Sequence, residues 1–135
     1  MEENRRPARL WLIALVVAHL IISMIHGSAH AGADVPLSRA ANLFVFIVIV
    51  AGPLAGVALT WRTERIGASV IAVTMAASLV FGFLNHFVIA SPDHVAHVAS
   101  QWRPLFATTA VLLVLTEAIS ASIALRLAQI RENVS

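Results

Sequence analysis

The histidines have the greatest potential for chemistry in this 135-residue chain, because it contains no cysteine, tyrosine or lysine. Neutral imidazole is a common ligand for Zn, Cu, Fe and Ni. Histidines three or four residues apart share one face of a helix. The pair His26 and His30 and the pair His94 and His97 have this spacing. The sequence therefore predicts a transition-metal site, with an aspartate that either binds the metal or orients an imidazole. The predicted metal residues are His26, His30, His86, His94, His97 and Asp93.

The first three histidines along the chain form one polar stripe if their segment is helical. Each helical residue advances about 100° around the axis, which places His26 at about −20° and His30 at about 20° from His19. Ser23 falls at about 40°. With a rise of about 1.5 Å per residue, the stripe is roughly 16 Å long. A single histidine in a membrane often only hydrogen-bonds a neighbouring helix. Three aligned histidines favour a ligand set or a proton path, because intramembrane ionisable groups are costly.

A second histidine pair follows a helix-start signal. Ser91 is suited to cap a helix, Pro92 to its first position, and Asp93 to its first turn. We therefore expect a short interfacial helix from about residue 92 to 100, with Asp93, His94 and His97 on one face. The alternative is a solvated polar loop with no ligand role.

Glu117 is the carboxylate nearest the middle of an apolar segment, about 14 residues from Arg103. Such a group is either protonated or paired. His19 has a similar expected depth, so the two residues are predicted to meet as part of a proton or ion path. The alternative is a neutral Glu117 that hydrogen-bonds and fixes helix packing.

The elements that position these residues must be membrane helices. Hydrophobic residues make up 59% of the chain and charged residues 12%, and the mean hydropathy is +0.87. A helix needs about 20 apolar residues to cross a hydrocarbon core of roughly 30 Å. The sequence predicts an all-α, up-down bundle of four transmembrane helices in a single domain, residues 1–135. The expected spans are residues 10–28, 40–61, 66–90 and 104–127.

The arginines predict the orientation of this bundle. Seven of the nine fall on the side of the N-terminus, and the other two, Arg39 and Arg103, fall opposite. The positive-inside rule then places both termini in the cytoplasm and the histidine cluster on the extracytoplasmic side. Trp11, Trp61 and Trp102 fall where interfacial tryptophans are expected. The seven arginines are Arg5, Arg6, Arg9, Arg62, Arg65, Arg126 and Arg131.

An alternative for the N-terminus is a cleaved signal peptide. A basic stretch, an apolar run and Ala29-His30-Ala31 resemble the pattern of such a segment, although the apolar run is long for one. Cleavage would leave three spans and remove His19, His26 and His30. We expect the segment to be retained.

Small residues predict close helix packing. Gly52-x-x-x-Gly56 and Ala118-x-x-x-Ser122 permit helices to approach each other, and they leave open a homo-oligomer or a larger membrane complex. Pro53 should kink its helix, because it lacks the backbone N–H for Ile49 and clashes with that carbonyl. The lipid bilayer is the expected partner. The basic charge follows from membrane topology, so nucleic acid is not expected.

Three hypotheses about function remain from the sequence. The first is an outward-facing site for Zn, Cu or Fe that serves metal handling or metal-dependent chemistry. The second is a non-catalytic accessory or interaction subunit. The third is a haem-binding electron carrier, for which His26 and His86 would be the best ligand pair because they lie on different helices at similar depth.

Overall fold

The computed structural model describes residues 5–129, so Arg131 lies outside the described part of the chain. It is a helical bundle with four segments long and apolar enough to cross a membrane. These segments are Arg6–Gly32, Arg39–Thr60, Glu64–Val88 and Arg103–Gln129. They agree with the expected spans to within four residues at each end.

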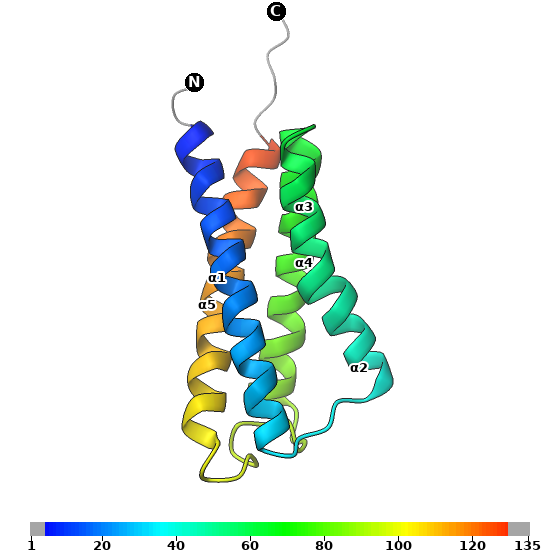
Figure 1. Cartoon of the computed structure of the whole chain (residues 1–135), viewed down its shortest axis with the longest axis vertical. Coiled ribbons are helices and arrows are strands. Elements are labelled where there is room, and N and C mark those ends of the chain that lie inside the picture. Colours follow the sequence, from blue (N-terminus) through cyan, green and yellow to red (C-terminus); the bar gives the residue numbers. More distant parts are fainter. Residues whose placement is uncertain (1–4, 130–135) are drawn as a thin grey trace, which may run out of the picture.

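The first span is the single helix α1 (Arg5–Gly32). The second span consists of α2 (Arg39–Phe44), a π-helical segment η2 (Val45–Ala51) and α3 (Gly52–Thr60). The third consists of α4 (Glu64–Phe83) and a π-helical segment η3 (Leu84–Val88), and the fourth is α5 (Arg103–Gln129). α1 begins and α5 ends at the same end of the bundle (Figure 1). The loop from α1 to α2 and the loop from η3 to α5 lie at the opposite end (Figure 1).

The second span changes from α-helix to π-helix and back to α-helix next to Pro53. The π-helical turns of η2 end directly before Gly52, and α3 restarts with Pro53 in its first turn. A proline removes one backbone donor from the helix, and the wider π-turns are a known response to such an interruption. α3 packs against α4, whereas α2 leans away from α1 toward the loop end (Figure 1).

The half of the bundle that contains the chain ends is closed by apolar packing. Its core is made of buried residues from α1, α4 and α5: Leu12, Val16, Ala68, Ile71, Ala72, Met75, Ala124 and Leu127. A second, smaller core lies at the loop end and contains Ala29, Val35, Val98 and Phe106. The polar residues of interest lie between these two cores.

The glycine pair of the second span packs inside the chain. A Cβ at Gly56 would meet the side chain of Ile71, and one at Gly52 would meet Thr74, so both glycines face α4. Ala118 and Ser122, in contrast, line a groove on the surface of α5. Association with another copy or partner therefore remains a prediction for the α5 face.

Candidate metal centre

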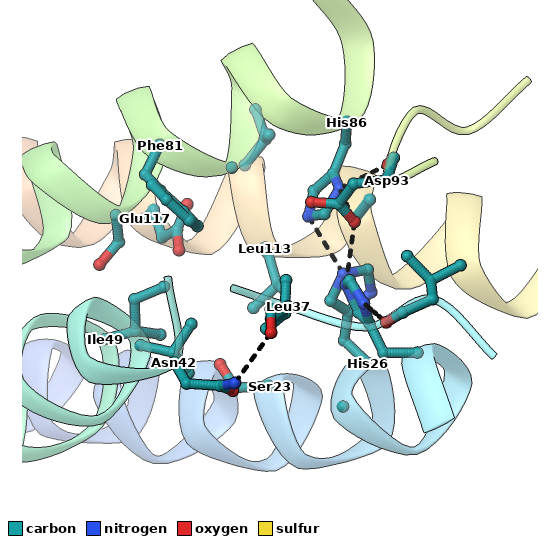
Figure 2. A pocket seen from close by; sticks show the side chains of 18 of the residues that line it. Ser23, His26, Leu37, Asn42, Ile49, Phe81, His86, Asp93, Leu113 and Glu117 are labelled. Atoms are coloured by element: carbon teal, nitrogen blue, oxygen red, sulfur yellow. Dashed lines mark hydrogen bonds and ion pairs between the residues drawn. The ribbon is translucent and has the colours of Figure 1, made fainter. Parts of the chain in front are cut away.

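Three histidines from two different spans converge at the loop end of the bundle. His26 and His30 lie one turn apart on α1, and His86 comes from η3. One ligand atom from each lies within 4.8 Å of the others, and all three residues are buried. His30 belongs to the last turn of α1, because this helix extends to Gly32. Figure 2 shows His26 and His86 facing each other across the site.

The π-helical turn at the end of the third span directs His86 into the bundle. η3 ends at Ile89, whose backbone is extended and whose N–H donates to the carbonyl of Leu84 five residues back. The carbonyl of His86 accepts from the N–H of Val95, which folds the following loop over the site. π-turns of this kind occur frequently at functional sites because they shift side chains out of the α-helical register.

One side of the cluster is formed by an aromatic ring. Phe106 on α5 is fully buried, and its ring centroid lies 4.7 Å from that of His26, 4.8 Å from His30 and 5.2 Å from His86. This packing holds the imidazoles in place and keeps that side of the cluster apolar.

Hydrogen bonds fix which nitrogen of His26 and of His86 carries the proton. The hydroxyl of Thr109 donates to the carbonyl of Leu105 at 2.7 Å, so it accepts from His26 Nδ1 at 2.8 Å. His30 Nδ1 donates to the carbonyl of Val35 at 3.3 Å. His86 Nδ1 donates to the carbonyl of Asp93 at 3.1 Å. The tautomers of His26 and His86 are assigned from these partners, which leaves the lone pair of each neutral ring on Nε2. Both nitrogens of His30 face an acceptor, because Nε2 also lies 3.2 Å from Asp93 Oδ1, so this ring can offer its lone pair on Nε2 when Nδ1 donates to Val35.

These lone pairs point at each other or at a carboxylate. His26 Nε2 and His86 Nε2 are 3.1 Å apart, and His30 Nε2 is 3.2 Å from Asp93 Oδ1. Two lone pairs at such distances repel unless a proton or a cation lies between them. Two imidazole nitrogens bound to one tetrahedral Zn²⁺ at about 2.0 to 2.1 Å would be separated by about 3.3 Å. The spacing of 3.1 Å therefore fits two ligands of one metal as well as an N–H···N hydrogen bond between the two rings.

Asp93 completes the donor set from the second loop. Its Oδ1 is buried without a hydrogen bond of good geometry, although it also lies 3.3 Å from His86 Nδ1. Burial would raise the pKa of Asp93, but its hydrogen-bond contact with His86 and its attraction to the protonated forms of the His86, His30 and His26 imidazoles lower the pKa below its ordinary value. The carboxylate is thus kept ionised, as a metal ligand or an orienting group must be.

His94 and His97 lie outside this cluster. Their rings pack on each other with centroids 5.3 Å apart, and His97 is exposed. His97 Nδ1 donates to the carbonyl of Ser91, and His94 Nδ1 accepts from the N–H of Ala96. The structure therefore brings together four of the six predicted metal residues and leaves these two apart.

The interfacial helix expected over residues 92 to 100 is not formed, and that prediction was wrong. The segment is a series of turns. Ser91 Oγ does accept from the N–H of Asp93, as a helix cap would. The backbone groups of Ser91, Asp93 and Val95 then bind His97, His86 and the carbonyl of His86 instead of continuing a helix. Side chains that bind nearby backbone groups compete with helix formation in this way.

A chamber of about 360 Å³ extends from the histidine cluster into the bundle. It lies between α1, α2 with η2, α4 and α5. Most of its lining is apolar, including Ile49, Phe81 and Leu113 (Figure 2). Glu117 lines it as well, so the chamber connects the cluster with this buried carboxylate. His19 and Glu117 do meet, with 3.7 Å between Nδ1 and Oε1.

The sequence did not indicate three parts of the site: Thr109, Phe106 and the carbonyl of Val35. Thr109 lies on α5 in a run of apolar residues, and a single threonine in such a run usually bonds the helix backbone. The position of His26 opposite it depends on how α1 and α5 rotate against each other, which no pattern in the sequence specifies.

The geometry does not favour haem at this centre. Two axial imidazoles must lie on opposite sides of the iron, about 4 Å apart if each bond is about 2 Å long, with the macrocycle between them. His26 Nε2 and His86 Nε2 are 3.1 Å apart, and both rings touch His30 and Phe106.

No protein-family model, curated protein or solved structure matches this chain. The function must therefore be argued from the site itself.

Proposed function

We propose that this integral membrane protein binds one divalent transition metal at His26, His30, His86 and Asp93, and that it handles this metal at the membrane. The observation that carries the proposal is the convergence of three imidazole lone pairs and one carboxylate oxygen. Each Nδ1 has a separate acceptor, so each ring can carry its hydrogen there and offer Nε2 to a metal. Such partners are a regular feature of histidine metal sites.

The donor set limits the choice of metal. Three imidazoles and one carboxylate suit Zn, Cu or Fe, whereas hard cations such as Mg²⁺ and Ca²⁺ prefer oxygen ligands. Three histidines with one oxygen in tetrahedral geometry are typical of zinc. If Asp93 only orients His86, the fourth position faces the chamber and is open to an exchanging ligand.

We propose further that the cluster faces the extracytoplasmic side. The arginines support this orientation, because Arg62, Arg65 and Arg126 lie at the end of the bundle remote from the cluster. A reporter that is active only in the cytoplasm, fused after Ser135, should therefore be active, and one that is active only outside should not. The opposite pattern would place the cluster on the cytoplasmic side.

The metal content of the purified protein tests the proposal. Detergent-purified protein incubated with Zn²⁺ and then dialysed should retain about one equivalent per chain. Joint His26→Ala and His86→Ala substitution should abolish this retention. Joint His94→Ala and His97→Ala substitution is the matched control, because it removes two histidines beside the same site and should leave retention unchanged.

Folding of the variants is checked by circular dichroism and by their elution as single species. Wild-type protein that retains none of Zn²⁺, Cu²⁺ or Fe²⁺ would overturn the proposal and favour an accessory subunit. Equal retention by the His26 and His86 double variant and by wild type would also overturn it.

A further inference from the structure

His19 and Glu117 form a second set of metal-type donors at the inner end of the chamber. The side chain of His19 is fully buried, and that of Glu117 is 3% exposed. They come from α1 and α5 and lie near the middle of their spans. Seven residues separate His19 from His26, so the pair is about 10 Å below the cluster along α1. Figure 2 shows Glu117 at the end of the chamber remote from His26 and His86.

The orientation of His19 follows from the break in the second span. Pro53 has no backbone N–H, so it cannot donate to the carbonyl of Ile49 four residues earlier. That carbonyl accepts from His19 Nε2 at 3.2 Å. Because Nε2 carries the hydrogen, the lone pair of the neutral ring is on Nδ1, which faces Glu117.

The distance between the two side chains suits an ion between them. His19 Nδ1 and Glu117 Oε1 are 3.7 Å apart, which exceeds the roughly 3.2 Å limit of a good hydrogen bond. A water that bridges two groups at about 2.8 Å with tetrahedral geometry would hold them about 4.6 Å apart. Two ligands of one metal at about 2.0 to 2.1 Å lie roughly 2.9 to 4.1 Å apart, depending on the angle at the metal. The observed separation falls in the range of the metal.

Several polar atoms around this pair have no hydrogen-bond partner although they are buried. They include His19 Nδ1 and Glu117 Oε2. The hydroxyls of Ser23 and Ser120 are also without partners. Ser23 lies one turn nearer the cluster than His19 on α1, and Ser120 lies one turn farther from the cluster than Glu117 on α5. Unpaired buried polar groups are costly. One imidazole and one carboxylate are therefore available to a cation at this depth.

Apolar packing closes the bundle beyond the pair. Leu12 and Val16, two turns and one turn before His19 on α1, are fully or almost fully buried with Ile71 and Met75. The chamber gives the pair a connection to the histidine cluster, and Ser23 and Asn42 supply polar atoms along its wall. The chamber is thus a route by which a cation could pass from the cluster to the pair.

We propose that His19 and Glu117 are a second, weaker station for the divalent transition metal, loaded from the histidine cluster through the chamber. The inference rests on the proposed function, because it assigns the cluster as the entry site. The chain would then move a metal ion from its outer face to the middle of the bilayer in two steps. The apolar core below the pair would be the barrier to further passage.

Titration of the full-length protein in detergent with Zn²⁺ tests the second station. Isothermal calorimetry should give about two equivalents for wild type, one tight and one weaker. Glu117→Gln retains the shape of the side chain but removes its charge, and it should lose the weaker equivalent while keeping the tight one. Glu64→Gln, at the start of α4, removes the same charge far from the chamber and should bind two equivalents.

The same titration separates this proposal from the proposed function. A single equivalent in wild type, unchanged in Glu117→Gln, would overturn the second station and leave the cluster in place. Two equivalents in Glu117→Gln would also overturn it. Loss of only the tight equivalent in the His26→Ala and His86→Ala double variant would support both sites, whereas retention of both equivalents would overturn the cluster instead. Zn²⁺-dependent unfolding temperatures of each variant confirm that the protein titrated is folded.

Discussion

Thr109→Val tests whether the hydrogen bonds behind the imidazoles prepare the site for metal. The substitution keeps the shape of the side chain but removes the acceptor that His26 Nδ1 uses at 2.8 Å. Thr109 is 4% exposed and His26 is 6% exposed, so water is poorly placed to replace the lost oxygen. The change acts behind the ligand and removes no ligand atom.

The expected effect falls on the metal-bound state. Without metal, the ring of His26 can move its proton to Nε2 and donate to His86 Nε2, which lies 3.1 Å away. With metal on Nε2, the proton must stay on Nδ1, where valine offers no acceptor. An unpaired buried donor costs about 1 to 3 kcal/mol, and each 1.4 kcal/mol changes an affinity about tenfold. We therefore expect zinc affinity to fall by about 10- to 100-fold, a range typical for loss of such a partner.

The assay is competition for Zn²⁺ with a chromogenic chelator, together with unfolding temperatures measured with and without metal. Thr116→Val is the matched control, because Thr116 lies on the same helix and its hydroxyl also donates to backbone carbonyls, of Leu112 and Leu113. The control should bind zinc as wild type does. Thr109→Val protein with wild-type zinc affinity, or with the same loss of stability in both metal states, would refute the assignment of the tautomers.

Two further predictions concern packing and pH. Gly67→Ala should destabilise the protein by about 1 to 3 kcal/mol, because its Cβ would meet the backbone of Thr60 and Gly56. Gly27→Ala should not destabilise the protein, because its Cβ meets nothing within 4 Å. Equal unfolding temperatures for the two variants would contradict the close packing of α3 on α4. Zinc affinity should fall once the pH is low enough to protonate the imidazoles, because a protonated imidazole has no lone pair. The pKa of Asp93 lies below its ordinary value, so this carboxylate stays charged while the imidazoles titrate, and a zinc affinity that does not fall at any pH at which the protein stays folded would show that imidazoles are not the ligands.

Much of the architecture could be predicted because the bilayer imposes strict rules. A segment that crosses it must be a helix of a certain length, and the four expected spans agree with the structure. The polar stripe on the first span was also predictable, since helical periodicity alone places His26 and His30 on one face. Periodicity could not give the length of α1. This helix continues to Gly32 because the apolar residues of the smaller core at the loop end pack around Ala29.

The limits of prediction appear where side chains compete with the backbone. Ser91, Pro92 and Asp93 have the sequence of a helix start, yet His97 and His86 take the backbone carbonyls that a helix would use. Local propensities cannot include a partner such as His86, which lies outside the segment, or the fold of the loop that brings His97 back to Ser91. The same reason explains why His94 and His97 could not be separated from the other histidines in advance, because spacing specifies a shared face but not what that face contacts.

Pro53 connects the fold of this bundle with its chemistry. A proline inside a span is usually read only as a kink. Here the interruption coincides with the π-helical turns of η2. On the loop side of these turns α2 leans away from α1 (Figure 1), and Val45 and Ile49 from η2 line the chamber. The same interruption leaves the carbonyl of Ile49 without the N–H of residue 53, and His19 binds this carbonyl. One residue thus helps to make the space between the spans and also turns the free nitrogen of His19 toward Glu117. Both effects are needed for a cation to reach the middle of the bundle, because an open chamber without oriented donors would offer it no ligands.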